Sequence, residues 1–323
     1  MSGTIIVTGG AGFIGANIVR ELNTRGADDV VIVDRLRDGD KWRNLVGLRF
    51  EDLVDKDAFR DDVIIDDVPW DVDAVVHMGA CSSTTETDAD YLADNNYRYT
   101  RDLCEWCLRR GVRFVYASSA ATYGDGSLGY SDDEAATPGL RPLNMYGYSK
   151  HMFDLWALRS GLFDRIVGLK YFNVYGPLED HKGDMRSVVN KAYGQIVETG
   201  RVGLFRSYRP EYPDGGQVRD FVYVRDAVDV TLHFLEDRDT GGLFNCGTGQ
   251  ARSWTDLANA TFVAAERTPD IEFIDMPATL RERYQYHTEA DLARLRAAGY
   301  AKPFTSLEDG VRDYVCGHLA AGS

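Results

Sequence analysis

A glycine-rich segment between a short apolar run and a helical pattern constrains the fold of this chain more than any other feature. Residues 4–8 have the β-branched, apolar character of a buried parallel strand. Gly9, Gly12 and Gly15 follow at once, and apolar residues then recur at helical spacing to about Arg25. Glycines in such a turn let backbone N–H groups approach a pyrophosphate at the start of a helix. The segment therefore predicts a dinucleotide-binding βαβ unit.

An acidic residue stands where such a unit needs one. A second apolar run, residues 30–33, ends in Asp34, about 20 residues after Gly15. A carboxylate at this position binds the ribose of the adenosine. Strand, glycine turn, helix and acid together favour a dinucleotide site over a phosphate-free turn in another α/β protein.

The choice between NAD and NADP stays open at this point. Asp34 alone favours NAD, whose adenosine ribose carries a free 2′-hydroxyl. Arg35, Arg37 and Lys41 lie just beyond it and could neutralise a 2′-phosphate. The same three cations could equally form an exposed basic patch in a loop.

Strand-like and helix-like segments alternate through the first half of the chain. We expect further strands over residues 45–50, 73–77, 113–117 and 166–172, and helices over 91–110 and 145–160. This succession predicts an α/β fold with a doubly wound parallel sheet of the Rossmann type. We assign residues 1–174 to a dinucleotide-binding domain with a returning segment near 218–236. Residues 175–323, which are richer in turn residues, are predicted to form mainly a smaller C-terminal α/β substrate-binding lobe.

Several candidate site residues follow the predicted strands directly. Gly79-Ala80, Ser118-Ser119 and Asn173 each come after a strand, as the glycine turn does. Ligands of parallel sheets bind beyond the carboxyl ends of the strands, so we expect one shared site there. His77 lies inside its strand, and we interpret it as a core residue whose hydrogen bonds are satisfied.

A tyrosine and a lysine four residues apart open the predicted helix 145–160. Tyr146 and Lys150 would lie on one face of that helix. An ammonium group near a phenol favours the phenolate and lowers the pKa of the phenol. Tyr146 could then remove a proton from an alcohol while a nicotinamide takes the hydride. The spacing is common in any chain, so this hypothesis depends on the dinucleotide site.

Composition narrows the classes of function. The net charge of −15 argues against a nucleic acid or an anionic membrane as partner. No apolar run is long enough to span a bilayer, and the N-terminus shows no signal peptide. Five scattered cysteines suit a reducing cytoplasm. Cys104 and Cys107 form a C-x-x-C without a second pair, so we interpret them as buried thiols and predict no metal site.

Longer blocks resemble a known enzyme family. The glycine turn, the Ser118/Ser119 pair and Tyr146–Lys150 are similar to the extended short-chain dehydrogenase/reductase superfamily. Within it the chain resembles the ADP-L-glycero-D-manno-heptose 6-epimerase family over nearly its whole length. The blocks that carry this resemblance are residues 79–86, 94–97, 118–124, 171–177, 181–183, 219–224 and 295–300.

The resemblance implies an isomerase that inverts C6 of a nucleotide-linked heptose through a transient ketone. Tyr146 matches the first acid/base of the family and Lys182 the second. Without the resemblance, Lys182 would be interpreted as a solvated loop lysine. Lys150 would hold the nicotinamide ribose and lower the pKa of Tyr146. Ser119 would hydrogen-bond the reacting oxygen, with Ser118 as the alternative.

The resemblance also implies the ligands and their binding residues. It favours NADP over NAD, an ADP-heptose substrate, a role in lipopolysaccharide core or other heptose synthesis, and a cytoplasmic homo-oligomer, namely a pentamer. The implied cofactor-binding residues are Gly9, Gly10, Gly12, Phe13, Ile14, Gly15, Asp34, Arg35, Lys41, Lys56, Met78, Gly79, Ala80, Cys81, Ser82, Asn95, Lys150, Val174 and Lys182. The implied substrate-binding residues are Ser119, Asn173, Asp184, Lys191, Phe205, Arg206, Ser207, Tyr208, Arg219 and Tyr284.

Some positions depart from the family pattern. Asp184 stands where the family has a small or hydroxyl residue, Lys191 where some members have histidine, and Met78 where some have an acid. The loop 206–217 is also longer. These departures affect the contacts with sugar and nucleotide and leave the hydride chemistry intact.

Two alternatives of other kinds stay open. One is a related nucleotide-sugar 4-epimerase or 4,6-dehydratase, although Ala120-Ala121 stand where such dehydratases carry an acidic pair. The other is a non-catalytic dinucleotide sensor, which would not need Ser119, Tyr146 and Lys150.

Overall fold

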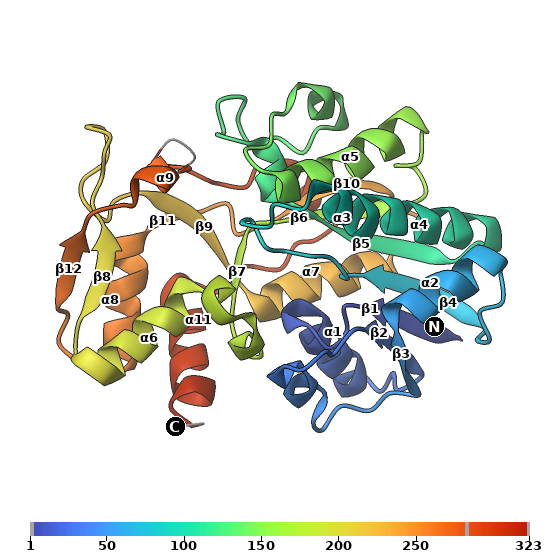
Figure 1. The fold of residues 1–323 in the computed structure, drawn as a ribbon, viewed down its shortest axis with the longest axis horizontal. Helices are drawn as coiled ribbons and strands as arrows, with labels where there is room; N and C mark the ends of the chain where they lie inside the picture. The colour runs from blue at the N-terminus through green and yellow to red at the C-terminus, as the bar shows by residue number, and fades with distance from the viewer. Residues whose placement is uncertain (1–2, 282–283, 322–323) are drawn as a thin grey trace.

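A seven-stranded parallel sheet forms the main body of the protein (Figure 1). The computed structural model describes residues 3–281 and 284–321. The strand order is β10-β6-β5-β4-β1-β2-β3, and every ladder in this sheet is parallel. The strands are β1 (Thr4–Thr8), β2 (Val30–Asp34), β3 (Asp52–Asp55), β4 (Val72–His77), β5 (Arg113–Ser119), β6 (Val167–Tyr171) and β10 (Gly242–Cys246). The predicted doubly wound α/β fold is confirmed.

Helices cover both faces of this sheet. Ile5 and Val7 of β1 belong to one buried cluster and Ile6 to the other, because successive strand side chains point to opposite faces. The first cluster is covered by α1 (Phe13–Thr24) and α7 (Val224–Glu236). The second is covered by α2 (Lys56–Ile65), α4 (Tyr99–Arg110) and α5 (Met145–Arg159). Burial on both faces explains why the strands are continuously apolar.

The third predicted strand is wrong. Residues 45–50 form no strand, because η1, a 3₁₀ helix (Asp40–Leu45), ends there and β3 begins only at Asp52. Leu45, Leu48 and Phe50 instead pack from a loop against the first buried cluster. The apolar pattern therefore reflects loop packing rather than sheet pairing.

The predicted helix 91–110 contains a wider turn. A short helix α3 (Ala89–Leu92) continues through a π-helical segment η2 (Ala93–Arg98) into α4. Such turns inside α-helices are rare and often mark functional sites. Cys104 and Cys107 are buried on α4 as predicted, and all five cysteines are free thiols.

The chain returns to the main sheet after residue 223. Helix α7 packs against α1 and β5, and β10 then adds a seventh strand beside β6. The sequence analysis did not anticipate β10. The division of the chain at residue 174 stays a prediction.

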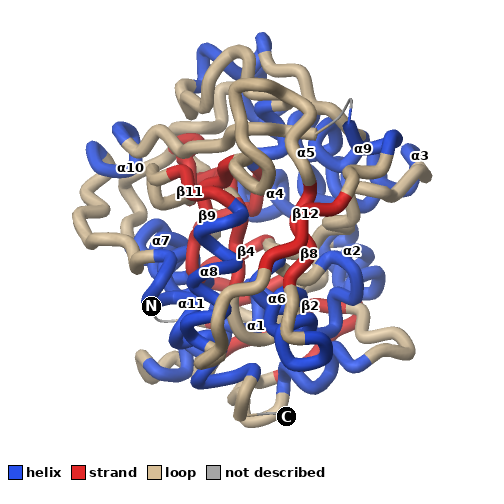
Figure 2. The backbone as a smooth tube through the Cα atoms, turned by 90° about the vertical axis from the view of Figure 1, so that its left-hand side faces the viewer, coloured by secondary structure: helices blue, strands red, loops and turns tan. Residues whose placement is uncertain are grey.

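A second region lies beside the sheet, on the left in Figure 1 and towards the viewer in Figure 2. It contains β7 (Asn173–Tyr175), β9 (Val218–Tyr223) and β11 (Ala251–Ser253) in one small sheet, and β8 (Val202–Phe205) and β12 (Ile271–Ile274) in another. Helices α6 (Val188–Thr199), α8 (Trp254–Ala264) and α11 (Leu307–Tyr314) pack around them. The other short elements are η3 (Ala120–Tyr123), η4 (Glu134–Gly139), η5 (Asp180–Met185), α9 (Ala278–Arg281), α10 (Ala293–Ala297) and η6 (Val315–Leu319). Within the described ranges, no helix has both the length and the apolar character needed to cross a membrane.

Candidate active site

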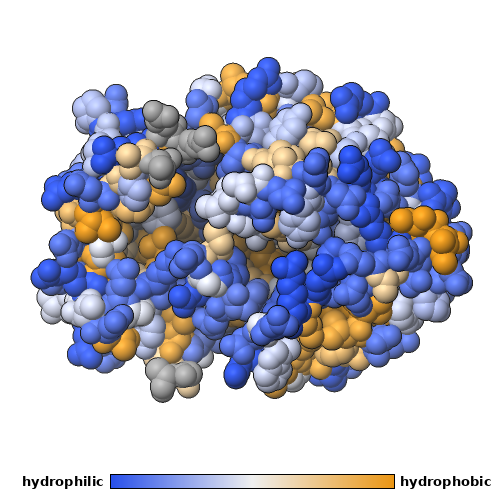
Figure 3. Space-filling model, viewed as in Figure 1, coloured by the Kyte–Doolittle hydropathy of each residue, from blue (hydrophilic) through white to orange (hydrophobic). Residues whose placement is uncertain are grey.

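A cleft of about 780 Å³ lies beyond the carboxyl ends of the main strands. Thr8, Asp34, Met78, Ser119 and Tyr171, which end or follow five different strands, all line it. Figure 3 shows the surface hollowed on this face, with hydrophilic residues around the hollow. The volume is in the range of small-molecule and cofactor sites. The single shared site expected at this edge of the sheet is therefore present.

Most of the predicted site residues line this one cleft. All four predicted catalytic residues do so, as does Asn173. The predicted cofactor residues that line it are Gly9, Gly12, Phe13, Ile14, Gly15, Asp34, Arg35, Lys41, Lys56, Met78, Gly79, Ala80, Cys81, Ser82, Asn95, Lys150, Val174 and Lys182.

The glycine turn has the geometry of a phosphate cradle. Gly9 has φ +65°, and a Cβ atom on Gly15 would lie 2.2 Å from the Gly9 carbonyl oxygen, so neither position accommodates a side chain. Gly12 caps α1 without a side-chain hydrogen bond, which leaves the helix start available to an anion. Gly10 does not line the cleft, because it packs against the strands on the side away from it. A Cβ on Gly10 would lie 2.8 Å from the Val7 carbonyl oxygen. Its contact with the cofactor stays a prediction.

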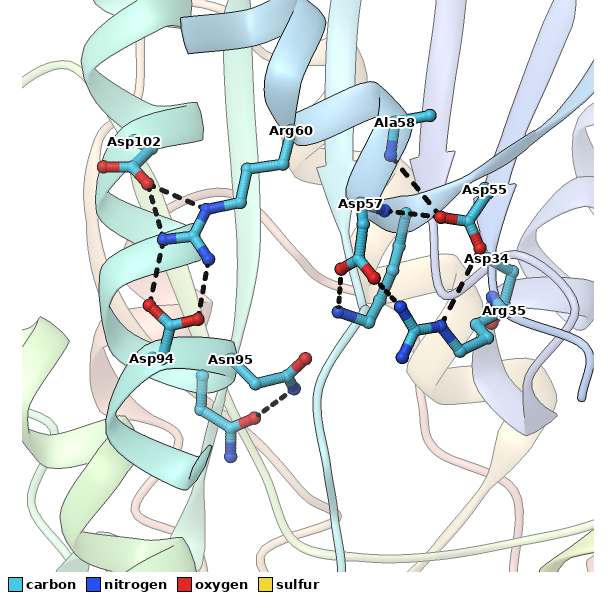
Figure 4. A network of polar contacts seen from close by, with 11 residues as sticks. Asp34, Arg35, Asp55, Asp57, Ala58, Arg60, Asp94, Asn95 and Asp102 are labelled. Carbon is cyan, nitrogen blue, oxygen red and sulfur yellow. Dashed lines mark hydrogen bonds and ion pairs between the residues drawn. The ribbon is translucent and has the colours of Figure 1, made fainter. Parts of the chain in front are cut away.

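The edge of the cleft at the end of β2 carries paired charges (Figure 4). Asp34 is buried, and its carboxylate accepts hydrogen bonds from the Ala11 N–H (2.9 Å) and the Lys41 ammonium (2.5 Å). Arg35 forms ion pairs with Asp55 and Asp57. The three cations predicted to meet a 2′-phosphate all line the cleft, but aspartates already pair with two of them, Arg35 and Lys41.

Two buried polar atoms on the π-helical side of the cleft have no partner among the described residues. They are the Asn95 Oδ1 atom and the Tyr99 hydroxyl, and both residues line the cleft. Buried polar groups are nearly always hydrogen-bonded, so these orphans indicate that a polar ligand completes this part of the site. Tyr99 was not predicted. Its position four residues after Asn95 on an expected helix is a signal that could have found it.

Tyr146 lies in the first turn of α5. The Asn144 side chain caps this helix by accepting a hydrogen bond from the Gly147 N–H (2.8 Å). A Cβ on Gly147 would lie 2.7 Å from the Ala121 carbonyl oxygen, so the helix start packs closely against the segment after Ser119. Tyr146 and Ser119 therefore face the same part of the cleft.

The expected net lowering of the Tyr146 pKa is wrong. Burial raises the pKa of Tyr146, and hydrogen bonding with the Ser119 hydroxyl only partly opposes this shift. The Lys150 ammonium instead donates to the Ala117 carbonyl oxygen (2.8 Å) on β5. Burial also lowers the pKa of Lys150 to about 8. Loss of hydration outweighs the attraction that the i, i+4 spacing suggested.

A hydrogen-bond network around the buried Asn96 holds the backbone of Tyr146 in place. Asn96 accepts from the Cys81 N–H and donates to the Cys81 carbonyl oxygen, both at 2.9 Å, and also donates to the Ser149 hydroxyl (3.0 Å). Ser149 in turn donates to the Tyr146 carbonyl oxygen (2.7 Å). Asn96 thereby joins the loop after β4 to the first turn of α5. Sequence reasoning missed it because an asparagine inside a helical pattern carries no distinguishing signal.

His77 is a core residue, as predicted. Its ring nitrogens lie 2.6 Å from the Thr8 hydroxyl and 2.9 Å from the Thr100 hydroxyl. Complete burial lowers the pKa of His77 to about 3, so the ring is neutral at neutral pH. It belongs to the support of the site rather than to its chemistry.

Lys182 lies on η5, and its ammonium is 5.1 Å from the centre of the Phe13 ring. Burial lowers its pKa; Glu179 opposes this shift and Lys191 adds to it. A lowered pKa means that the ammonium gives up its proton more readily than an exposed lysine does, as a proton-handling group must.

Two asparagine side chains hold this loop against the start of α1. Asn17 donates to the Pro177 carbonyl oxygen (3.0 Å), and Asn44 donates to the Leu178 carbonyl oxygen (3.1 Å). Asn44 Nδ2 also lies 3.1 Å from His181 Nδ1 and donates to the Ala11 carbonyl oxygen (3.0 Å) of the glycine turn. The loop that carries Lys182 is therefore attached to the predicted phosphate cradle.

Most of the predicted substrate residues lie outside this cleft. Those that do not line it are Asp184, Lys191, Phe205, Arg206, Ser207, Tyr208, Arg219 and Tyr284. Arg219 is buried, and its guanidinium lies 5.1 Å from the Tyr284 ring and 5.6 Å from the Trp254 ring. Trp254 itself lines the cleft, so this second cluster adjoins it. Trp254 was not predicted, because a single aromatic residue at a helix start carries no distinctive pattern.

The exposed members of the predicted substrate set are engaged elsewhere or point to solvent. Arg206 pairs with Asp214 (3.3 Å), and Tyr208 donates to Asp275 (3.0 Å). Asp184 is exposed. Their predicted substrate contacts stay predictions.

Comparison with known proteins places the chain among enzymes. Residues 5–247 match the NAD dependent epimerase/dehydratase family. A relative from Nitratidesulfovibrio vulgaris (strain DP4), named ADP-L-glycero-D-manno-heptose-6-epimerase, is 60% identical over 316 residues, which is 98% of each chain.

Two solved structures are similar over nearly their whole length. Helicobacter pylori ADP-L-glycero-D-manno-heptose-6-epimerase has a TM-score of 0.83 at 27% identity, covering 98% of this chain and 96% of that one. UDP-N-acetylglucosamine 4-epimerase from Methanobrevibacter ruminantium M1, in complex with UDP-N-acetylmuramic acid, has a TM-score of 0.81 at 26% identity, covering 99% of both chains. Together with the cradle of glycines and the cleft at the ends of the parallel strands, these matches show that the chain belongs to the NAD-dependent epimerase/dehydratase family.

Proposed function

We propose that this protein interconverts ADP-D-glycero- and ADP-L-glycero-D-manno-heptose by inverting C6, with bound NADP or, as the alternative, NAD. The observation that carries the proposal is that one cleft presents two separate groups able to exchange protons, Tyr146 on α5 and Lys182 on η5. An enzyme that returns a hydride to the opposite face of a ketone needs a proton-handling group for each orientation of the sugar.

The residues of the cleft fit the dinucleotide. The glycine turn and the start of α1 would hold the pyrophosphate, and Asp34, Arg35, Lys41 and Lys56 would surround the adenosine end. A nicotinamide bound in this way supplies a reversible hydride acceptor. Lys150, one turn after Tyr146 on α5, would bind the nicotinamide ribose.

The chain's own groups would move the protons. Tyr146 as phenolate takes the proton of the C6 hydroxyl while the C6 hydride leaves, and Ser119 donates a hydrogen bond to the same oxygen. After the ketone turns in the cleft, Lys182 as ammonium donates a proton to that oxygen when the hydride returns to the other face. The reaction is redox-neutral. Each turnover leaves Tyr146 protonated and Lys182 as a neutral amine, and both return to their starting states when Tyr146 loses a proton to solvent and Lys182 takes one up.

Sequence similarity favours the heptose substrate over other nucleotide sugars. The TM-scores of 0.83 and 0.81 do not separate a heptose 6-epimerase from a UDP-sugar 4-epimerase, because the two share the fold. The 60% identity to an ADP-heptose epimerase over 98% of the chain, against 26% to the 4-epimerase, does separate them. The proposal includes the predicted homo-oligomer, which light scattering can test, and the predicted cytoplasmic role in heptose supply.

Proton NMR of two parallel incubations tests this function. The purified protein is incubated with ADP-D-glycero-D-manno-heptose and, separately, with UDP-glucose. We expect epimerisation of the heptose and no change in UDP-glucose. Conversion of UDP-glucose alone would show that the protein is a 4-epimerase.

A further inference from the structure

The charges at the adenosine end of the cleft form a mixed cluster rather than a basic one. Four cations, Arg35, Arg37, Lys41 and Lys56, line the cleft there. Three carboxylates face them: Asp34 pairs with Lys41, and the other two belong to Asp55, the N-cap of α2, and Asp57 in its first turn. A site that selects a 2′-phosphate by charge would leave these cations free.

Asp57 is the carboxylate that pairs with two of these cations at once. The Lys56 ammonium donates to it at 2.5 Å, and the Arg35 guanidinium forms an ion pair with it. Figure 4 shows the carboxylate beside the Arg35 guanidinium, with Asp55 on the other side of that group. Asp55 is committed to the helix, since its side chain accepts from the Asp57 and Ala58 N–H groups as the N-cap of α2. Asp57 has no such capping role.

The neighbouring cation on α2 cannot replace Lys56. Arg60 is held by Asp94 (2.9 Å) and Asp102 (2.8 Å), which fix α2 to the π-helical segment and α4. In the part of the chain that the structure describes, Arg37 alone of the four cations has no ion-pair partner. A 2′-phosphate therefore has to compete with Asp57 for Arg35 and Lys56.

We propose that Asp57 is a specificity-determining residue for the cofactor: by pairing with Arg35 and Lys56 it weakens selection of a 2′-phosphate over a 2′-hydroxyl. NAD, which has no 2′-phosphate, does not compete for these cations, so its affinity is independent of Asp57. The natural chain accordingly discriminates between NADP and NAD less than its four cations suggest. This inference rests on the proposed use of a nicotinamide dinucleotide in this cleft.

Calorimetric titration of the full chain, freed of nucleotide, with NADP⁺ and with NAD⁺ tests the proposal without any turnover. In Asp57→Asn we expect the dissociation constant for NADP⁺ to fall about five- to tenfold, while that for NAD⁺ stays within about twofold. Asp57→Ser, with a residue well tolerated near helix starts, gives the same change if Asn disturbs α2. The matched control is Asp61→Asn, which removes the same charge from an exposed position one turn further along α2.

Each outcome decides a different point. A NADP⁺-to-NAD⁺ ratio in both Asp57 variants that stays within about twofold of the wild-type ratio overturns the role of Asp57 and leaves the proposed function intact. An equal shift in Asp61→Asn overturns it too, because the effect would then be one of net charge. If the wild-type chain binds neither dinucleotide, the proposed function fails, and this inference fails with it.

Discussion

Tyr146 and Lys182 reach the same cleft from supports of different kinds. Tyr146 lies on the 15-residue helix α5, whose first turn is capped by Asn144 and tied through Ser149 to the buried Asn96. Lys182 lies on the six-residue segment η5, beside Gly183 with φ +53°. Two side chains from the glycine-turn side, Asn17 and Asn44, hold that loop. One group is fixed by the core of the sheet domain and the other by contacts with the phosphate cradle.

This difference determines which substitutions can displace Tyr146 and which can displace Lys182. The support of Tyr146 is buried and continuous with the main sheet, so it changes only when the fold changes. The support of Lys182 includes Leu178, whose φ of +74° is uncommon for a residue with a side chain and is held in place by Asn44. We therefore expect the Lys182 side to respond to changes around the glycine turn that leave Tyr146 unaffected.

The largest effect should come from Tyr146→Phe. The variant removes the hydroxyl that exchanges the proton and leaves an inert ring in its place. We expect kcat to fall by about 10³–10⁴-fold while cofactor binding and thermal stability stay near wild type. Steady-state assay by NMR, together with calorimetric titration of the cofactor, measures both. Epimerisation at the normal rate would show that the acid/base assignment is wrong.

A smaller loss is expected for Lys182→Met. Lys182 is only half-buried, so water can take over part of its proton transfer. We expect kcat to fall by about 10²-fold. Because each epimer would present its C6 hydroxyl to a different group, single-turnover oxidation followed by absorbance should slow for one epimer only. Equal slowing for both epimers would contradict the proposal that Tyr146 and Lys182 each serve a different epimer.

The same contrast explains how much of the site the sequence could predict. Tyr146 and Lys150 share a helix, and helical spacing is visible in a sequence. The glycine turn and Asp34 follow strands and are found for the same reason. Lys182 lies on a loop, where spacing carries no geometry, and only the resemblance to a family indicated it.

The remaining errors come from long-range contacts. Asn96 and Trp254 act through partners far away in the sequence, and the opposite shift of the Tyr146 pKa arises from burial, which depends on the whole fold. β10 pairs with β6 across more than 70 residues of chain, and no local sequence pattern predicts a pairing over that separation. The false strand at 45–50 has the converse cause, because an apolar loop packed against a core resembles a strand in sequence.

Paired substitutions of the two supporting asparagines should separate stability from chemistry. Asn96→Ala leaves the Cys81 N–H, the Cys81 carbonyl and the Ser149 hydroxyl without their buried partner, so we expect a loss of about 2–3 kcal/mol in the free energy of unfolding. Asn44→Ala removes a donor from the Ala11 and Leu178 carbonyl oxygens but orphans no N–H group, so we expect a smaller loss of about 1 kcal/mol. Urea titration measures both values.

The rates of oxidation of the two epimers should then distinguish these two variants. Folded Asn44→Ala should slow oxidation of the epimer that depends on Lys182 by about tenfold and spare the other. Folded Asn96→Ala should instead slow oxidation of the epimer that depends on Tyr146 and spare the one that depends on Lys182. If Asn44→Ala slows both equally, the loop carrying Lys182 does not depend on this contact.

The smallest expected effect is the dependence of kcat/KM on pH. Burial lowers the pKa of Lys150 from 10.5 to about 8, so its ammonium loses a proton as the pH rises through that value. An ammonium near Tyr146 favours the phenolate, so kcat/KM should fall about threefold between about pH 7.5 and pH 8.5. In Lys150→Arg the charge persists, because arginine does not deprotonate in this range. The fall should therefore move to higher pH, even though the variant is slower at every pH.

If the fall stays in place in Lys150→Arg, the titrating group lies on the other side of the cleft. The same pH profile of Lys182→Met then shows whether Lys182, whose pKa is also lowered by burial, is that group.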